Sequence, residues 1–65
     1  MNEAEFLTSA ELENLLHLKP GTSAAWRCRG VGPAYSLAGR LPRYSRVDVD
    51  EWLKNRRHDP ASEAA

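Results

Sequence analysis

The sequence predicts a mainly α-helical domain with one small β-hairpin. Three observations support this fold class. Apolar residues near both ends of the chain recur at i, i+3 and i+4, the spacing of one helical face. Pro20 and Gly30 stand where they would start and stop a further short helix. Two short runs after that helix flank a glycine, as in a two-residue hairpin.

The first helix is predicted over residues 9–16. Thr8 fits its N-cap, because Glu11 follows three residues later and reaches back to the cap in the capping-box pattern. Glu13 stands with Glu11 near the start of the helix, where the helix dipole favours negative charge. Three leucines then lie on one face: Leu12, Leu15 and Leu16.

A second helix is predicted over residues 20–29. Pro20 suits the first position of a helix but disfavours a helical residue before it. The first helix is therefore expected to end near His17, a residue type that tolerates the left-handed conformation. Two short helices joined by such a turn have helix-turn-helix geometry. Trp26 is the large apolar residue of the second helix, so most of its circumference is expected to be exposed; a weak solvated helix is the alternative.

A hairpin is predicted after the second helix. Residues 34–37 form its first strand, Ala38 and Gly39 its tip, and residues 40–44 its return strand. Pro42 has no N–H to donate, so the return strand is either an edge strand or bulged at that residue. The sequence leaves both possibilities open.

A third helix is predicted over residues 46–57, with Ser45 as its N-cap. Three helices and a two-stranded wing make a winged helix-turn-helix over residues 6–57. A disordered or extended segment is expected at 1–5 and a flexible tail at 58–65. The predicted core comprises Phe6, Leu7, Leu12, Leu15, Leu16, Leu18, Trp26, Val31, Tyr35, Leu37, Leu41, Tyr44, Val49, Trp52 and Leu53.

The formal net charge is zero, but the charges are unevenly distributed along the chain. Residues 19–46 carry six basic side chains and no acidic one, whereas the segments before and after them carry net charges of −4 and −2. Duplex DNA presents about one negative charge per 1.7 Å of helix axis and attracts a concentrated cationic patch. The second helix and the hairpin, which lie in this segment, are therefore predicted to grip a DNA duplex, with their positive side chains on the same side of the molecule.

The predicted DNA contacts come from both elements. Hydroxyl groups at the start of the second helix would meet phosphates or base edges, and the backbone amides there would face phosphate. Arginines further along would bind phosphate or guanine, and Arg40 or Arg43 of the hairpin would reach the adjacent minor groove or its phosphates. These arginines are expected to serve DNA rather than packing. The predicted contact residues are Lys19, Thr22, Ser23, Arg27, Arg29, Arg40 and Arg43.

Other functional classes find little support in the sequence. Cys28 is the one cysteine, so neither an intrachain disulfide nor a cysteine-rich zinc site is possible. No nucleophile–base pair, phosphate loop or metal cluster is present, so no enzyme, cofactor or metal site is expected. No apolar run is long enough for a membrane span or a signal sequence, and the cytoplasm is the expected location.

Several segments, read in order, match one family. They are Leu7-Thr8-Ser9-Ala10-Glu11-Leu12, Leu15-Leu16, Pro20, Thr22, Trp26-Arg27-Cys28-Arg29-Gly30, Gly32-Pro33, Tyr35, Leu37, Gly39-Arg40, Arg43-Tyr44 and Asp48-Val49-Asp50-Glu51-Trp52-Leu53. This set resembles the excisionase-like, mercury-regulator-like winged-helix DNA-binding domains. The resemblance implies a second helix in the major groove and a wing in a minor groove. Ser23 departs from the family pattern, which commonly has an apolar residue there.

The resemblance also implies a function. Excisionases, or recombination directionality factors, bind side by side at attachment sites, bend the DNA and bias an integrase toward excision. The leading hypothesis is a protein of this type, encoded by a bacterium or a phage, with duplex DNA, neighbouring copies of itself and a tyrosine or serine recombinase as partners. A small transcription regulator is the alternative within the family. From another class, a protein-interaction module or antitoxin would use the basic face to bind an acidic partner.

Overall fold

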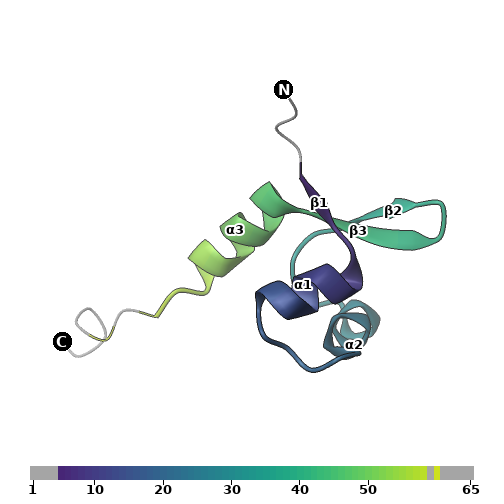
Figure 1. Cartoon of the computed structure of the whole chain (residues 1–65). Helices are drawn as coiled ribbons and strands as arrows, with labels where there is room; N and C mark the ends of the chain where they lie inside the picture. The colour runs from purple at the N-terminus through teal and green to yellow at the C-terminus, as the bar shows by residue number, and fades with distance from the viewer. Residues whose placement is uncertain (1–4, 59, 61–65) are drawn as a thin grey trace.

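The structure, a computed structural model, describes residues 5–58 and 60. The elements follow one another as β1 (Phe6–Leu7), α1 (Ser9–Leu15), α2 (Thr22–Arg29), β2 (Ser36–Ala38), β3 (Leu41–Ser45) and α3 (Arg46–Asn55). In Figure 1, α1 and α2 lie on one side of the sheet, α3 leads away from it, and the β2–β3 ribbon projects from the opposite end. Three helices and an antiparallel hairpin confirm the predicted winged helix-turn-helix. Most of the segments predicted as terminal tails, 1–5 and 58–65, lie outside the described residues.

The sheet has three antiparallel strands in the order β1-β3-β2. The short strand β1, which the sequence did not predict, pairs with the end of β3 through Phe6↔Ser45 and Leu7↔Tyr44. Two residues are too few for a period-two pattern, so no local signal marks this strand. It connects the start of the chain to the strand that leads into α3.

The hairpin differs from its prediction by one or two residues. Ala38 pairs with Leu41, so the tip is Gly39-Arg40 rather than Ala38-Gly39. Gly39 has a φ of +67°, a conformation that favours glycine. The register continues without interruption through Leu37↔Pro42, so Pro42 makes no bulge. Proline is tolerated there because β1 pairs only with the far end of β3, which leaves the strand edge beside Pro42 without a ladder.

The buried hydrophobic residues of the described chain number four: Leu7, Leu12, Tyr44 and Val49. They come from β1, α1, β3 and α3, and Leu16 packs against them. The predicted core was too large, because seven of its members are exposed: Phe6, Leu15, Val31, Tyr35, Leu37, Leu41 and Leu53. A 65-residue chain has too little volume to bury so many large side chains. The helix α2 contributes no large apolar residue to this core, so other contacts must hold it.

The helix ends follow the sequence signals with some exceptions. The capping box is present: the Thr8 N–H donates to Glu11 (2.9 Å) and the Glu11 N–H to the Thr8 hydroxyl (3.1 Å). His17 adopts the predicted left-handed conformation, with φ at 57°. Pro20 precedes α2 rather than starting it, and α3 ends at Asn55. Ser45 stands at the N-cap of α3, but its side chain makes no capping hydrogen bond.

Two tryptophans link α2 to α3. The rings of Trp26 and Trp52 lie 5.2 Å apart between centroids, at an angle of 46°. The Arg56 guanidinium covers the Trp52 ring at 4.8 Å.

None of the described helices is both long enough and apolar enough to span a bilayer.

Candidate nucleic-acid interface

A buried carboxylate anchors the start of α2 to α1. One oxygen of Glu13, Oε2, accepts hydrogen bonds from the Gly21 N–H (3.1 Å), the Ser23 N–H (3.0 Å) and the Ser23 hydroxyl (2.7 Å). Both side chains are buried. The Ser23 hydroxyl, followed by the Ser23 and Gly21 amides and the charge of Arg27, holds the pKa of Glu13 below its ordinary value, although burial opposes the shift. A charged hydrogen-bond cluster thus replaces apolar packing at this helix contact.

This cluster corrects two sequence-based expectations. Ser23, predicted to meet phosphates or base edges, is 1% exposed and points into the protein. The amides of Gly21 and Ser23, predicted to face phosphate, are bound to Glu13. From the sequence, Glu13 was explained by the helix dipole alone. It follows Leu12 and precedes Leu16 by three residues, so its position on the inner face of α1 could have indicated that it is buried.

Arg27 joins three elements of the fold. Its Nη1 donates to the Ser9 hydroxyl (3.0 Å) and to the Tyr44 hydroxyl (2.8 Å), which connects α2 to α1 and β3. The guanidinium carbon lies 5.8 Å from the centroid of the Tyr35 ring, which itself contacts Tyr44. Arg27 was expected to contact DNA and to take no part in packing. The second half of this expectation is wrong, because Arg27 holds α2 against α1 and β3.

The outward face of α2 consists mainly of small side chains. Ser23, Trp26 and Arg27, spaced i, i+3 and i+4, turn toward the protein, which leaves the opposite face open. The exposed residues of the helix are Ala24, Ala25, Cys28 and Arg29. The first three carry no charge and were not among the predicted DNA contacts, although most of the helix was expected to be exposed. Counting the helical period from Trp26 would have identified them.

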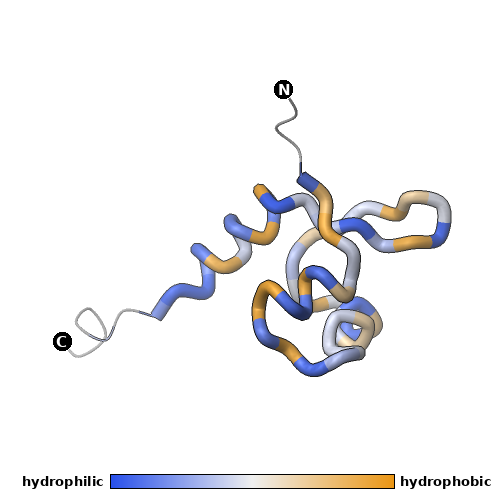
Figure 2. The backbone as a smooth tube through the Cα atoms, viewed as in Figure 1, coloured by the Kyte–Doolittle hydropathy of each residue, from blue (hydrophilic) through white to orange (hydrophobic). Residues whose placement is uncertain are grey.

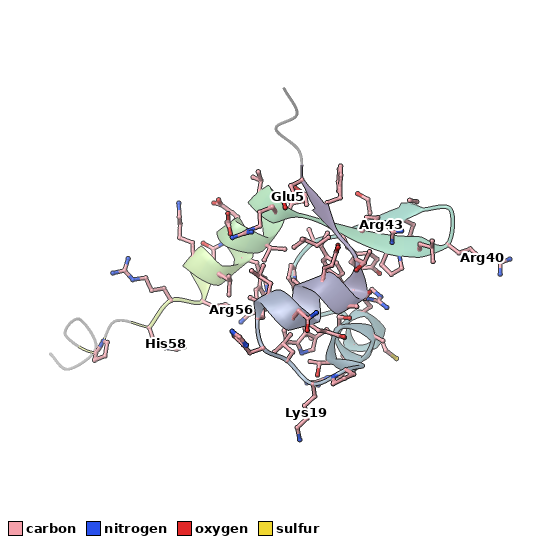
Figure 3. The ribbon with its side chains drawn as sticks, viewed as in Figure 1. Glu5, Lys19, Arg40, Arg43, Arg56 and His58 are labelled. Atoms are coloured by element: carbon pink, nitrogen blue, oxygen red, sulfur yellow. The ribbon has the colours of Figure 1, made fainter. Side chains whose placement is uncertain are left out.

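Two further predicted contacts lie at the start of α2. Lys19 is exposed in the turn before the helix, and Figure 3 shows its side chain pointing away from the body of the protein. Thr22, the first residue of α2, is half-buried. Lys19 and Arg29 therefore bracket the exposed face of α2 with positive charge.

The two wing arginines occupy different positions. Arg40 is at the hairpin tip, and Figure 3 shows it projecting from the far end of the ribbon. Arg43 lies on the opposite face of the sheet from Tyr44, the residue that meets α2, because successive side chains of a strand alternate. Its Nη1 donates to the Pro42 carbonyl (2.9 Å). The expectation that the positive side chains of helix and wing lie on the same side of the molecule is therefore wrong for Arg43. The ribbon that carries Arg40 extends beyond α2 (Figure 1).

Four of the predicted basic contacts are free of salt bridges in the part of the chain that the structure describes. Within residues 5–58 and 60, no acidic side chain forms a salt bridge with Lys19, Arg29, Arg40 or Arg43. The salt bridge that is present, between Arg46 and Asp50 (3.2 Å), lies on α3. The described residues also contain no group of three or more side chains suited to hold a metal ion.

Comparison with known proteins identifies this arrangement. The model of a family described as "Helix-turn-helix domain" matches residues 6–57, from β1 to beyond the end of α3. The chain belongs to the helix-turn-helix domain family. In such DNA-binding domains the second helix of the motif lies in the major groove, and α2 is that helix here. Comparison with curated proteins and with solved structures gave no match.

Proposed function

We propose that this helix-turn-helix domain is an architectural DNA-binding protein of the excisionase type. It binds a preferred duplex site, bends it, and biases an integrase toward one direction of site-specific recombination. The observation that carries the proposal is the combination of an α2 face made of small residues with a basic ribbon that extends beyond it. The resemblance of the ordered motifs to excisionases supports the finer assignment.

The exposed face of α2 fits close contact with the DNA backbone better than extensive reading of bases. Ala24 and Ala25 allow the helix to approach the groove, but they offer no hydrogen bonds to base edges. Lys19, Thr22 and Arg29 supply groups that bind phosphate. Phosphate contacts position a protein on DNA, whereas base contacts specify sequence. Much of the sequence preference would then come from the shape and deformability of the site, as suits a DNA-bending protein.

The ribbon is proposed to enter the adjacent minor groove with its tip first. Arg40 would then lie deepest, where a narrow groove attracts arginine. The two faces of a ribbon inserted in this way meet opposite walls of the groove, so Arg43 can reach a phosphate although it faces away from α2. Arg27 would act indirectly, because its bonds to Ser9 and Tyr44 fix the angle between helix and wing.

The proposal is tested by combining footprinting with a recombination assay. Footprinting on genomic DNA that flanks the gene locates the binding site, and circularly permuted duplexes that contain this site measure the bend. If an integrase is encoded in the same region, purified protein is then added to its recombination reaction. We expect a bent complex and stimulation of excision over integration. A bent complex at a promoter, without effect on recombination, would favour the small transcription regulator instead.

The remaining alternative predicts a different result in the binding assay. A protein-interaction module or antitoxin that binds an acidic protein has no need to neutralise an array of phosphates. Its association with DNA would be weak and insensitive to salt, whereas groove binding falls steeply as salt rises.

A further inference from the structure

The β2–β3 ribbon carries apolar side chains on both of its faces close to the tip. Leu37 is 63% exposed and Leu41 is 56% exposed. Leu37 pairs with Pro42 and Leu41 with Ala38, so the two leucines lie on opposite faces, one register step apart. Figure 2 shows hydrophobic segments on both arms of the ribbon. More than half of each side chain is therefore open to solvent.

The surroundings of these leucines indicate what kind of binding partner would cover them. Arg40 lies at the tip of the ribbon, next to Leu41, and Arg43 lies two residues after Leu41 on β3. The sequence from residue 19 to residue 46 contains no acidic residue. An apolar pair in a purely cationic setting fits an anionic partner that also offers apolar surface. The minor groove of DNA meets this description, because deoxyribose and base edges line its interior and phosphates line its rims.

The size of the ribbon decides how it would fit. A minor groove is roughly 6 Å wide in undistorted duplex DNA. Sheets stack roughly 10 Å apart, so a ribbon with side chains on both faces is about that thick. The ribbon cannot enter without opening the groove or placing a side chain between base pairs. Minor-groove proteins that insert apolar wedges partly unstack a step and kink the duplex toward the major groove.

From this geometry we propose that Leu37 and Leu41 form an apolar wedge that opens the minor groove and supplies the bend. The partner is double-stranded DNA at an easily unstacked step, such as a pyrimidine–purine step. The wedge rests on the proposed DNA binding, and it assigns the bending to two uncharged residues rather than to the arginines. Arg40 and Arg43 hold the ribbon in place, and the leucines deform the site.

The test separates bending from binding on a duplex with one binding site. Fluorescence transfer between dyes at the duplex ends reports the bend, and a titration reports the affinity, for wild type and for Leu37→Ser, Leu41→Ser and the double variant. We expect the double variant to bind on the order of ten-fold more weakly. It should lose most of the bend at saturation and keep the salt dependence of the wild type. Val47→Ser is the matched control, because Val47 is 62% exposed but belongs to α3.

A second measurement does not depend on the variants. Duplexes with 2-aminopurine at successive positions report unstacking as a rise in fluorescence when the wild-type protein binds. The wedge predicts a rise at one or two steps within the minor-groove footprint. A full bend in the double variant, or no unstacked step with the wild-type protein, would each overturn the wedge. Failure of the wild type to bind duplex DNA would instead remove the proposed function itself.

Discussion

The Ser23 hydroxyl lies 2.7 Å from Oε2 of Glu13 and donates a hydrogen bond to it, inside the contact between α1 and α2. Two backbone amides, from Gly21 and Ser23, donate to the same oxygen. The position of α2 therefore depends on a buried negative charge rather than on matched apolar side chains. A carboxylate in this position is sensitive to pH and to the loss of any one partner.

Acid should weaken the fold through Glu13. Because its pKa is lowered from the ordinary value of 4.5 in the folded protein, the carboxylate stabilises the fold above that value, and the stabilisation is lost as pH falls through the folded pKa. The difference in thermal midpoint between wild type and Glu13→Gln should thus be largest near neutral pH and shrink in acid. Glu51→Gln, on the exposed side of α3, is the control and should show no such convergence. A constant difference across the pH range would contradict the role of the charge.

Replacing both Ser23 and Glu13 should reduce the free energy of unfolding by less than the sum of the two single replacements. Ser23→Val leaves the Glu13 carboxylate buried with fewer partners, and Glu13→Ala leaves the Gly21 and Ser23 donors unsatisfied. The double variant removes the carboxylate and the hydroxyl together but still leaves the backbone N–H groups of residues 21 and 23 without their acceptor, so it should remain less stable than wild type. The loss of the Ser23–Glu13 side-chain bond, however, is counted once in the double variant and in each single variant. A double-mutant cycle by thermal or urea unfolding should therefore give a clear coupling energy; strictly additive losses would show that the two side chains act independently.

Substitutions of Arg27 and Arg29 should differ in their effect on stability, although both should weaken DNA binding. Arg27→Ala breaks hydrogen bonds to Ser9 and Tyr44, so it should reduce the free energy of unfolding by about 1–3 kcal/mol and weaken DNA binding as well. Arg29→Ala, on the exposed face of α2, should change stability by less than about 0.5 kcal/mol. It should weaken binding and reduce the salt slope by about 1.

Unfolding by urea and binding titrations on the same samples provide both measurements for this pair. Lys54→Ala is the control for a basic residue away from the interface, since it lies in the last turn of α3. An Arg29→Ala variant that binds DNA like the wild type would argue against α2 as the groove-binding helix.

Salt dependence should report the number of phosphates bound. If helix and wing neutralise about four to six phosphates, the slope of log K against log salt concentration should be near −4 to −5. The titration requires a single-site duplex and a range of salt concentrations that leaves the fold intact. A flat line would favour the protein-interaction module over any DNA-binding function.

Local signals predicted much of the fold. Thr8 and Glu11 form a capping box, His17 ends the first helix, and Gly39 turns the hairpin, because each depends on neighbouring residues in the sequence. The site was harder to predict. Ser23 and Arg27 looked like surface residues on a helix with few apolar groups, but their partners come from elements distant in sequence. Such tertiary hydrogen bonds are not marked by an apolar pattern, and here they take the place of the apolar packing that such a pattern indicates.

The most direct test of α2 as the groove-binding helix uses Cys28, the one thiol of the chain, which is exposed on that helix. Its rate of alkylation by N-ethylmaleimide is measured for the free protein, for the complex with footprinted duplex, and for the same mixture at a salt concentration that dissociates the complex. The rate should fall in proportion to the fraction of protein bound and recover at high salt. A saturated DNA complex in which Cys28 reacts as fast as in the free protein would contradict the placement of α2 in the groove.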